Sequence, residues 1–118
     1  PGPGDLLHYT IRLESPALAL AGVRVTDTLP VELEYQGDLW ASSGDGGQVG
    51  GVITWTGAVL AAQPVTITFS ARLDPQLTLP QAVVNKALID DGLGNVQERS
   101  ATVIANGQGQ YLPLIRRQ

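Results

Sequence analysis

Short stretches in which apolar and polar residues alternate run through this chain, and they restrict its fold more than any other feature. From Val65 to Leu73 every second residue is apolar, and the residues between are threonine, serine or arginine. Leu7–Leu13 shows the same pattern. A period of two places one set of side chains inward and the other toward solvent, so each stretch predicts a half-buried β-strand.

Shorter apolar stretches bounded by Gly, Pro, Asp and Asn predict further strands. They are Gly22–Thr26, Leu33–Leu39, Val52–Trp55, Val83–Ile89 and Val96–Ala105. The segment Asp90–Asn95 has the composition of a hairpin turn, and Ser42–Gly51, with five glycines, is expected to be an exposed flexible loop. Together these features predict an all-β, immunoglobulin-like Greek-key sandwich of about seven strands.

Composition supports one β-rich domain. The chain has 118 residues, of which 43% are hydrophobic and 15% charged, and its 14 Gly and 8 Pro suit many turns. Because it contains no cysteine, it has neither disulfides nor thiolate metal ligands. The sandwich is therefore expected to be held by apolar packing alone.

The charge pattern argues against two classes of partner. The net charge is −4, and the seven basic residues are scattered apart from Arg116 and Arg117. Nucleic acids and anionic membrane surfaces both require a clustered basic face. No stretch approaches the ~20 apolar residues of a membrane helix. The first residue is not Met, so the chain is expected to begin inside a longer reading frame.

The chain divides into three expected parts. Residues 1–4 (Pro-Gly-Pro-Gly) have the composition of a linker, residues 5–105 form the sandwich, and residues 106–118 form a tail. The tail contains the motif YLPLIRR, which resembles short endings of exported bacterial proteins. Its apolar residues suit docking on a neighbour or recognition by a sorting apparatus.

Four segments carry a resemblance to a known family. They are Gly4–Ile11 (GDLLHYTI), Gly22–Pro30 (GVRVTDTLP), Val52–Trp55 (VITW) and Val84–Ala87 (VNKA). In order and spacing they resemble the DUF11, or conserved-repeat, family over residues 4–105. The sequence departs from the family pattern at Ser15–Leu18, Gln63-Pro64 and Lys86, and these departures alter loops and one strand position. The resemblance implies a noncatalytic extracellular module of bacterial or archaeal surface proteins, serving as spacer, stalk or cohesive unit beside other domains of its chain.

Three residues are expected to be structural. The carboxylate of Asp27 is placed to accept backbone N–H bonds at its turn, and Asn85 shares a face with core residues, so its amide is expected to clamp a neighbouring loop. Trp55 is expected in the core. The expected core consists of Leu7, Tyr9, Ile11, Leu13, Val23, Val25, Trp55, Val65, Ile67, Phe69, Val83, Ala87 and Ile89.

Candidate chemistry is sparse. Asp90, Asp91 and Asn95 offer oxygen ligands for Ca²⁺, but their spacing is not that of an EF-hand, and an ordinary hairpin turn is the favoured interpretation. His8 is the single histidine and has no Ser, Asp or Glu partner assignable from the sequence. We therefore predict no catalytic residue, no cofactor and no enzyme.

Two aromatic residues leave a second function open. Tyr35 and Trp40 lie just before the glycine-rich segment, and if exposed together they could stack on a sugar ring. The alternative to a structural module is thus a carbohydrate- or protein-binding accessory domain attached to a secreted enzyme. Self-association through an edge strand or the tail is a further expected interaction.

Overall fold

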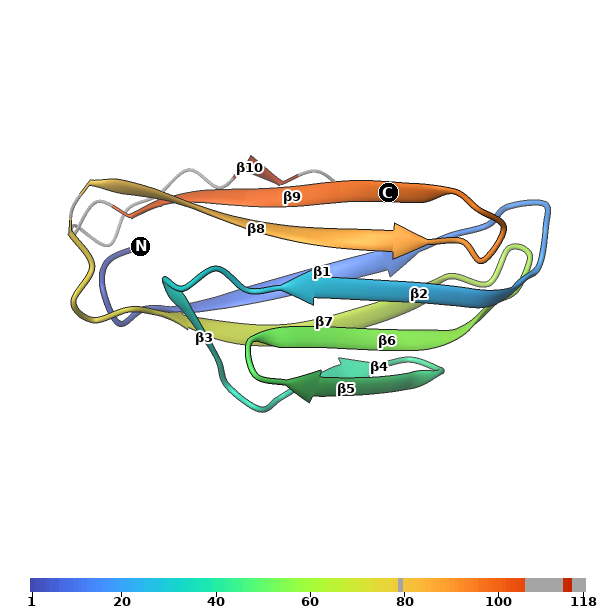
Figure 1. The fold of residues 1–118 in the computed structure, drawn as a ribbon, viewed down its shortest axis with the longest axis horizontal. Coiled ribbons are helices and arrows are strands. Elements are labelled where there is room, and N and C mark those ends of the chain that lie inside the picture. The colour runs from blue at the N-terminus through green and yellow to red at the C-terminus, as the bar shows by residue number, and fades with distance from the viewer. Residues whose placement is uncertain (79, 106–113, 116–118) are drawn as a thin grey trace.

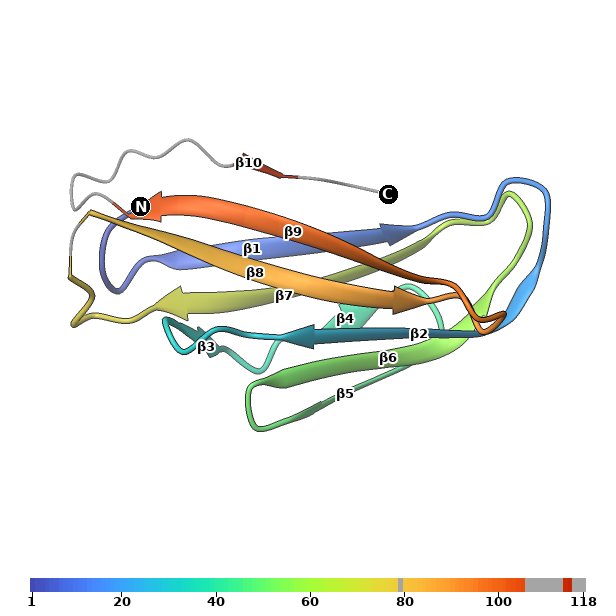
Figure 2. The ribbon, with the colours of Figure 1, turned by 45° about the horizontal axis from the view of Figure 1, so that its top comes forward.

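Two antiparallel β-sheets pack face to face in the computed structural model, which describes residues 1–78, 80–105 and 114–115 (Figures 1 and 2). The strands are β1 (Leu6–Leu13), β2 (Leu20–Thr28), β3 (Leu33–Tyr35), β4 (Trp40–Ala41), β5 (Asp45–Val49), β6 (Val52–Val59), β7 (Val65–Leu73), β8 (Gln81–Asp90), β9 (Val96–Ala105) and β10 (Leu114–Ile115). Within the described ranges there is no helix, and hence none long and apolar enough to cross a membrane.

The chain crosses repeatedly between the two sheets. One sheet has the order β1-β7-β3, with β4 also paired to β7, and the other has the order β10-β9-β8-β2-β6-β5. The chain crosses between sheets after β1, β2, β4, β6 and β7. The expected immunoglobulin-like sandwich is therefore confirmed, and the seven expected strands correspond to β1, β2, β3, β6, β7, β8 and β9.

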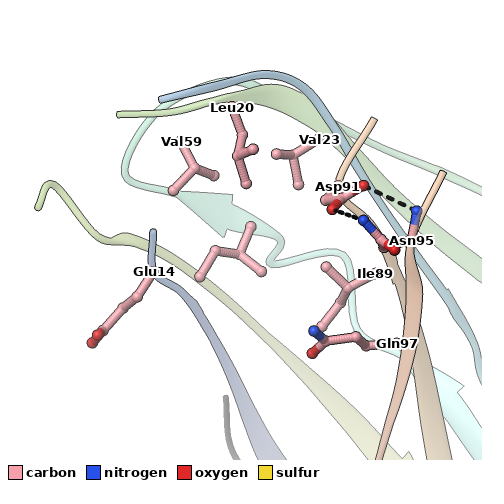
Figure 3. Close-up of a pocket in the computed structure, with 9 residues that line it drawn as sticks. Glu14, Leu20, Val23, Val59, Ile89, Asp91, Asn95 and Gln97 are labelled. Atoms are coloured by element: carbon pink, nitrogen blue, oxygen red, sulfur yellow. Dashed lines mark hydrogen bonds between the residues drawn. The ribbon is translucent and has the colours of Figure 1, made fainter. Parts of the chain in front are cut away.

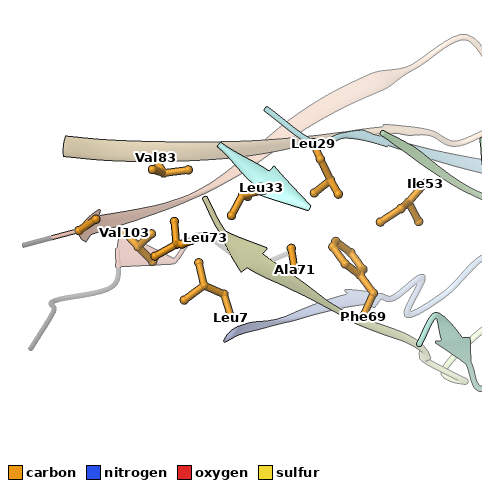
Figure 4. Packing of buried hydrophobic residues seen from close by; sticks show 10 residues of the cluster. Leu7, Leu29, Leu33, Ile53, Phe69, Ala71, Leu73, Val83 and Val103 are labelled. Atoms are coloured by element: carbon orange, nitrogen blue, oxygen red, sulfur yellow. The ribbon is translucent and has the colours of Figure 1, made fainter. Parts of the chain in front are cut away.

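The core fills the space between the sheets along their whole length. One group of buried residues, shown in Figure 4, gathers around Phe69 and Leu73, and a second gathers around Trp55 and Ile67. All thirteen expected core residues face inward, although Tyr9, Ile11 and Ile89 are only partly buried. Additional buried residues are Leu29, Leu33, Ile53, Val59, Ala71, Leu73, Val103 and Ala105.

The expected loop at Ser42–Gly51 is wrong in its central part. Asp45–Val49 forms β5, which pairs with β6 in register from Asp45↔Thr56 to Val49↔Val52. Its turn contains Gly50, whose φ is 62°. Glycine composition favours a loop only when the backbone lacks a pairing partner, and here the β6 backbone supplies one.

Both ends of the domain make contacts within the chain. In the segment 1–4, which stays the expected linker, Gly2 N donates to Asp5 Oδ2 at 2.8 Å and Gly4 N donates to the carbonyl of Leu73 at 2.9 Å. In the tail, β10 pairs with β9 of the same chain. The rest of the YLPLIRR motif lies outside the described residues.

Candidate functional site

A buried polar pair lies on the inner face of the larger sheet. Asp27 of β2 is 2% exposed and Asn85 of β8 is 4% exposed, and Asn85 Nδ2 donates to Asp27 Oδ2 at 2.9 Å. The two strands are neighbours, with Asp27 opposite Ala87. The predicted partners, which were backbone groups of a turn for Asp27 and of a loop for Asn85, are therefore wrong: the two side chains bind each other. Local sequence could not show this pairing, because the two residues are 58 positions apart.

Burial has the largest effect on the pKa of Asp27. Desolvation raises the pKa of Asp27 to about 6, against the opposing hydrogen bond from Asn85. Tyr9 comes from the facing sheet, and both its own burial and the negative charge of Asp27 raise the pKa of its phenol. An acid from one sheet and a phenol from the other thus both have buried oxygens in the core.

The raised pKa of Asp27 predicts a pH dependence of stability. Between about pH 4 and 6 the folded chain holds a proton that the unfolded chain has released, so the free energy of unfolding falls as pH rises through this window. From the shift of 3.8 to about 6, the loss is about 2–3 kcal/mol. Urea unfolding at several pH values measures it.

The control for this prediction is Asp27→Asn, which keeps the shape but does not titrate. Asp38 and Asp91, whose pKa values are lowered, add stability as pH rises and remain in both proteins. The difference between the two curves therefore reports Asp27 alone. Parallel curves for the wild type and Asp27→Asn would contradict the assignment.

A second polar cluster lies on the outer face of the smaller sheet. His8 Nδ1 lies 2.8 Å from Ser70 Oγ, and Ser70 N donates to Asp38 Oδ1 at 2.8 Å. Hydrogen bonding from Ser70 lowers the pKa of Asp38. The structure thus gives His8 the serine and aspartate neighbours that sequence reasoning did not find, because they lie 62 and 30 residues away.

The arrangement of this second cluster indicates a structural role and not a catalytic one. In a catalytic triad the carboxylate orients the histidine, whereas here Asp38 bonds the serine backbone. Ser70 is itself buried, which closes its hydroxyl to a substrate. The hydrogen bonds join β1, β7 and the segment between β3 and β4.

The calcium candidates form a hydrogen-bonded turn. Asp91 Oδ1 accepts from Leu93 N and Asn95 N, its Oδ2 accepts from Asn95 Nδ2, and Asp90 Oδ1 accepts from Gly92 N. The Asn95 amide, followed by Leu93 N–H, lowers the pKa of Asp91. These oxygens are occupied by the groups that close the β8–β9 hairpin.

We expect chelation to leave the stability of this turn unchanged. Excess EDTA should not shift the melting temperature, because the carboxylates already have protein donors. Asp91→Ala should lower the melting temperature with or without EDTA. A fall on adding EDTA that calcium reverses would establish a metal site instead.

An apolar pocket of about 100 Å³ opens beside this turn, at one end of the sandwich (Figure 3). Its wall consists of Leu13, Leu20, Val23, Val59 and Ile89, and its rim of Glu14, Asp91, Asn95 and Gln97. Figure 3 shows Asp91 and Asn95 joined at the rim by their hydrogen bonds. Asp91 and Asn95 thus close the hairpin, whereas Glu14 pairs with Arg12 and Gln97 accepts from Arg99.

The aromatic candidates do not share one environment. Trp40 is 56% exposed on the outer part of the smaller sheet, whereas the ring of Tyr35 packs partly against the core and its hydroxyl accepts from Leu39 N at 2.9 Å. Trp55 is 1% exposed, and its Nε1 donates to the carbonyl of Ser43 at 2.7 Å. Trp40 is thus the exposed member of the proposed sugar platform.

Comparison with known proteins gives the fold and no family. No protein-family model and no curated protein matches the sequence. The structure is similar to domains D2 and D3 of the major pilin SpaD from Corynebacterium diphtheriae, with a TM-score of 0.62 and 14% identity over 87% of this chain and 48% of that chain. It is also similar to the full-length SpaD pilin, with a TM-score of 0.63 and 14% identity over 94% of this chain and 36% of that one.

The likeness covers nearly all of this chain but less than half of the pilin chains. At 14% identity it establishes a shared sandwich architecture and nothing about residues or partners.

Proposed function

We propose that this chain is a noncatalytic structural module of a larger exported or cell-surface protein, of the DUF11 type, which spaces or joins neighbouring domains. The observation that carries the proposal is the similarity of the sandwich to part of a major pilin, a protein whose domains include D2 and D3. The VTDTLP segment and the later Trp55 and Asn85 support the family assignment.

The shape suits a spacer. The molecule measures 44 × 25 × 22 Å, and its strands run along the long axis (Figure 1). The radius of gyration is 15.0 Å, above the ~13.5 Å expected of a compact domain of this length. Ile11 and Leu39 pack against both buried groups and so link them into one core, which supports a stiff unit.

A domain replacement in the parent protein tests this function. Residues 5–105 are exchanged for an unrelated β-sandwich of the same length, and a deletion of the same residues serves as the control. A spacer predicts that the exchange keeps surface display and the reach of the neighbouring domains, while the deletion shortens that reach. Loss of a specific binding activity in the exchanged protein would overturn the proposal.

The exposure of Trp40 favours one alternative, a carbohydrate- or protein-binding accessory domain. Its test is tryptophan fluorescence across a glycan panel, with Trp40→Ala as the matched variant. A saturable change that disappears in the variant would establish binding, and a flat response would dismiss the sugar platform.

Self-association is a second proposed interaction of the module. In the described part of the chain, β5 ends one sheet and β1 ends the other, each with one paired neighbour. Such edges can add a strand from another chain. Sedimentation over a range of concentrations tests it, and a constant monomer mass would remove the proposal.

A further inference from the structure

Three oxygen atoms in the core remain unpaired. The Tyr9 hydroxyl, Asp27 Oδ1 and Asn85 Oδ1 are shielded from solvent and make no hydrogen bond to any residue that the structure describes. An unpaired buried polar group costs about 1–3 kcal/mol, so native proteins keep only a few, and each calls for an explanation. Three such atoms in one region indicate that another partner satisfies them.

The groups approach the same space from opposite sheets. Tyr9 belongs to β1 in the smaller sheet, and its ring stacks on Phe69 with centroids 5.3 Å apart and planes inclined by 20°. Asp27 and Asn85 belong to the larger sheet and are fixed by their mutual hydrogen bond. The Tyr9 ring packs against the buried group that includes Ile53, and Ile53 lies opposite Asp27 in the register of β2 and β6, which places Tyr9 and Asp27 in the same part of the core.

The unpaired atoms define what the missing partner must supply. With its amide N–H directed to Asp27 Oδ2, Asn85 leaves its Oδ1 as an acceptor. Asp27 Oδ1 is a second acceptor, and the Tyr9 hydroxyl needs an acceptor for its proton. The partner must therefore donate two hydrogen bonds and accept one.

We propose that one ordered water molecule lies among these three groups, accepting from Tyr9 and donating to Asp27 and Asn85. Buried waters make about three hydrogen bonds to otherwise unsatisfied groups, which is the number available here. A sodium ion would leave the Tyr9 proton without an acceptor. A proton on Asp27 would not by itself satisfy the three atoms, because none of them makes a hydrogen bond to a residue that the structure describes. The water joins the two sheets at a site that no side chain bridges.

A high-resolution crystal structure tests the site directly. We expect an isolated density peak at hydrogen-bonding distance, about 2.6–3.2 Å, from all three oxygen atoms. A peak with clearly shorter contacts that strengthens on rubidium exchange would identify a cation and overturn the proposal. A direct Tyr9–Asp27 hydrogen bond with no peak between the sheets would also overturn it.

Solution measurements use a matched pair of conservative variants. Tyr9→Phe removes one partner of the water, whereas Tyr35→Phe removes a hydroxyl that already has a protein donor, Leu39 N. Water-oxygen magnetic relaxation dispersion should show one long-lived water in the wild type and in Tyr35→Phe, and a shorter residence time in Tyr9→Phe. Equal dispersion in all three proteins would contradict the assignment.

Discussion

Replacement of Trp55 by alanine is expected to lower the free energy of unfolding by about 3–5 kcal/mol, the cost of emptying a large aromatic site in a packed core. The side chain is 1% exposed and belongs to the same buried group as Val25 and Ile67. Its loss also leaves the carbonyl of Ser43 without the indole donor. Urea or thermal unfolding followed by circular dichroism measures the change.

The chain supplies its own control in Trp40, the other tryptophan. Trp40→Ala removes the same atoms from a site that is 56% exposed, so it should change stability by less than about 1 kcal/mol. Comparable losses in the two variants would show that Trp55 is not the residue that closes the core.

Gly44→Ala is the second substitution with a large expected effect. Gly44 has a φ of 80°, and a Cβ there would lie 2.5 Å from Cζ2 of Trp55. The backbone penalty of a non-glycine residue at positive φ adds to the displacement of a buried ring, for a total of about 2–4 kcal/mol. Chemical denaturation measures the loss.

Gly37→Ala separates these two causes. Gly37 has nearly the same φ, 79°, but a Cβ there meets nothing within 4 Å. It should therefore show the backbone penalty alone, about 1 kcal/mol. Equal losses at Gly37 and Gly44 would mean that the contact with Trp55 contributes nothing.

Coupling between Gly44 and Trp55 can be measured in a double-mutant cycle. If the steric conflict is with the indole, Gly44→Ala should cost less in the Trp55→Ala protein, where the space is open. Additive losses would place the conflict elsewhere.

Strands could be predicted from the sequence where apolar and polar residues alternate along the chain. The alternation in Leu7–Leu13 and Val65–Leu73 predicted β1 and β7, and β9 has the predicted bounds Val96–Ala105. The glycine-rich β5 was missed because its strand state depends on pairing with β6, and the close approach of the preceding Gly44 to the Trp55 indole likewise joins separate segments. No local pattern in the segment reports either partner.

For the polar sites, too, the sequence predicted what depends on local pattern and missed what depends on distant partners. That Asn85 must be satisfied inside the core followed from its place among apolar residues, but its partner Asp27 lies 58 positions away. The cluster of His8, Ser70 and Asp38 had no sequence signal, because its members come from two strands and a loop.

The sequence by itself determined the all-β class, the inward faces of the main strands and the hairpin at Asp90–Asn95, because each depends on neighbours along the chain. Only the tertiary structure decided which buried polar groups meet, that Asp27 and Tyr9 place buried oxygens in the core from opposite sheets, and that β5 is a strand. Those outcomes depend on the packing of distant segments, in which the burial of one residue sets the hydrogen bonding and protonation of another.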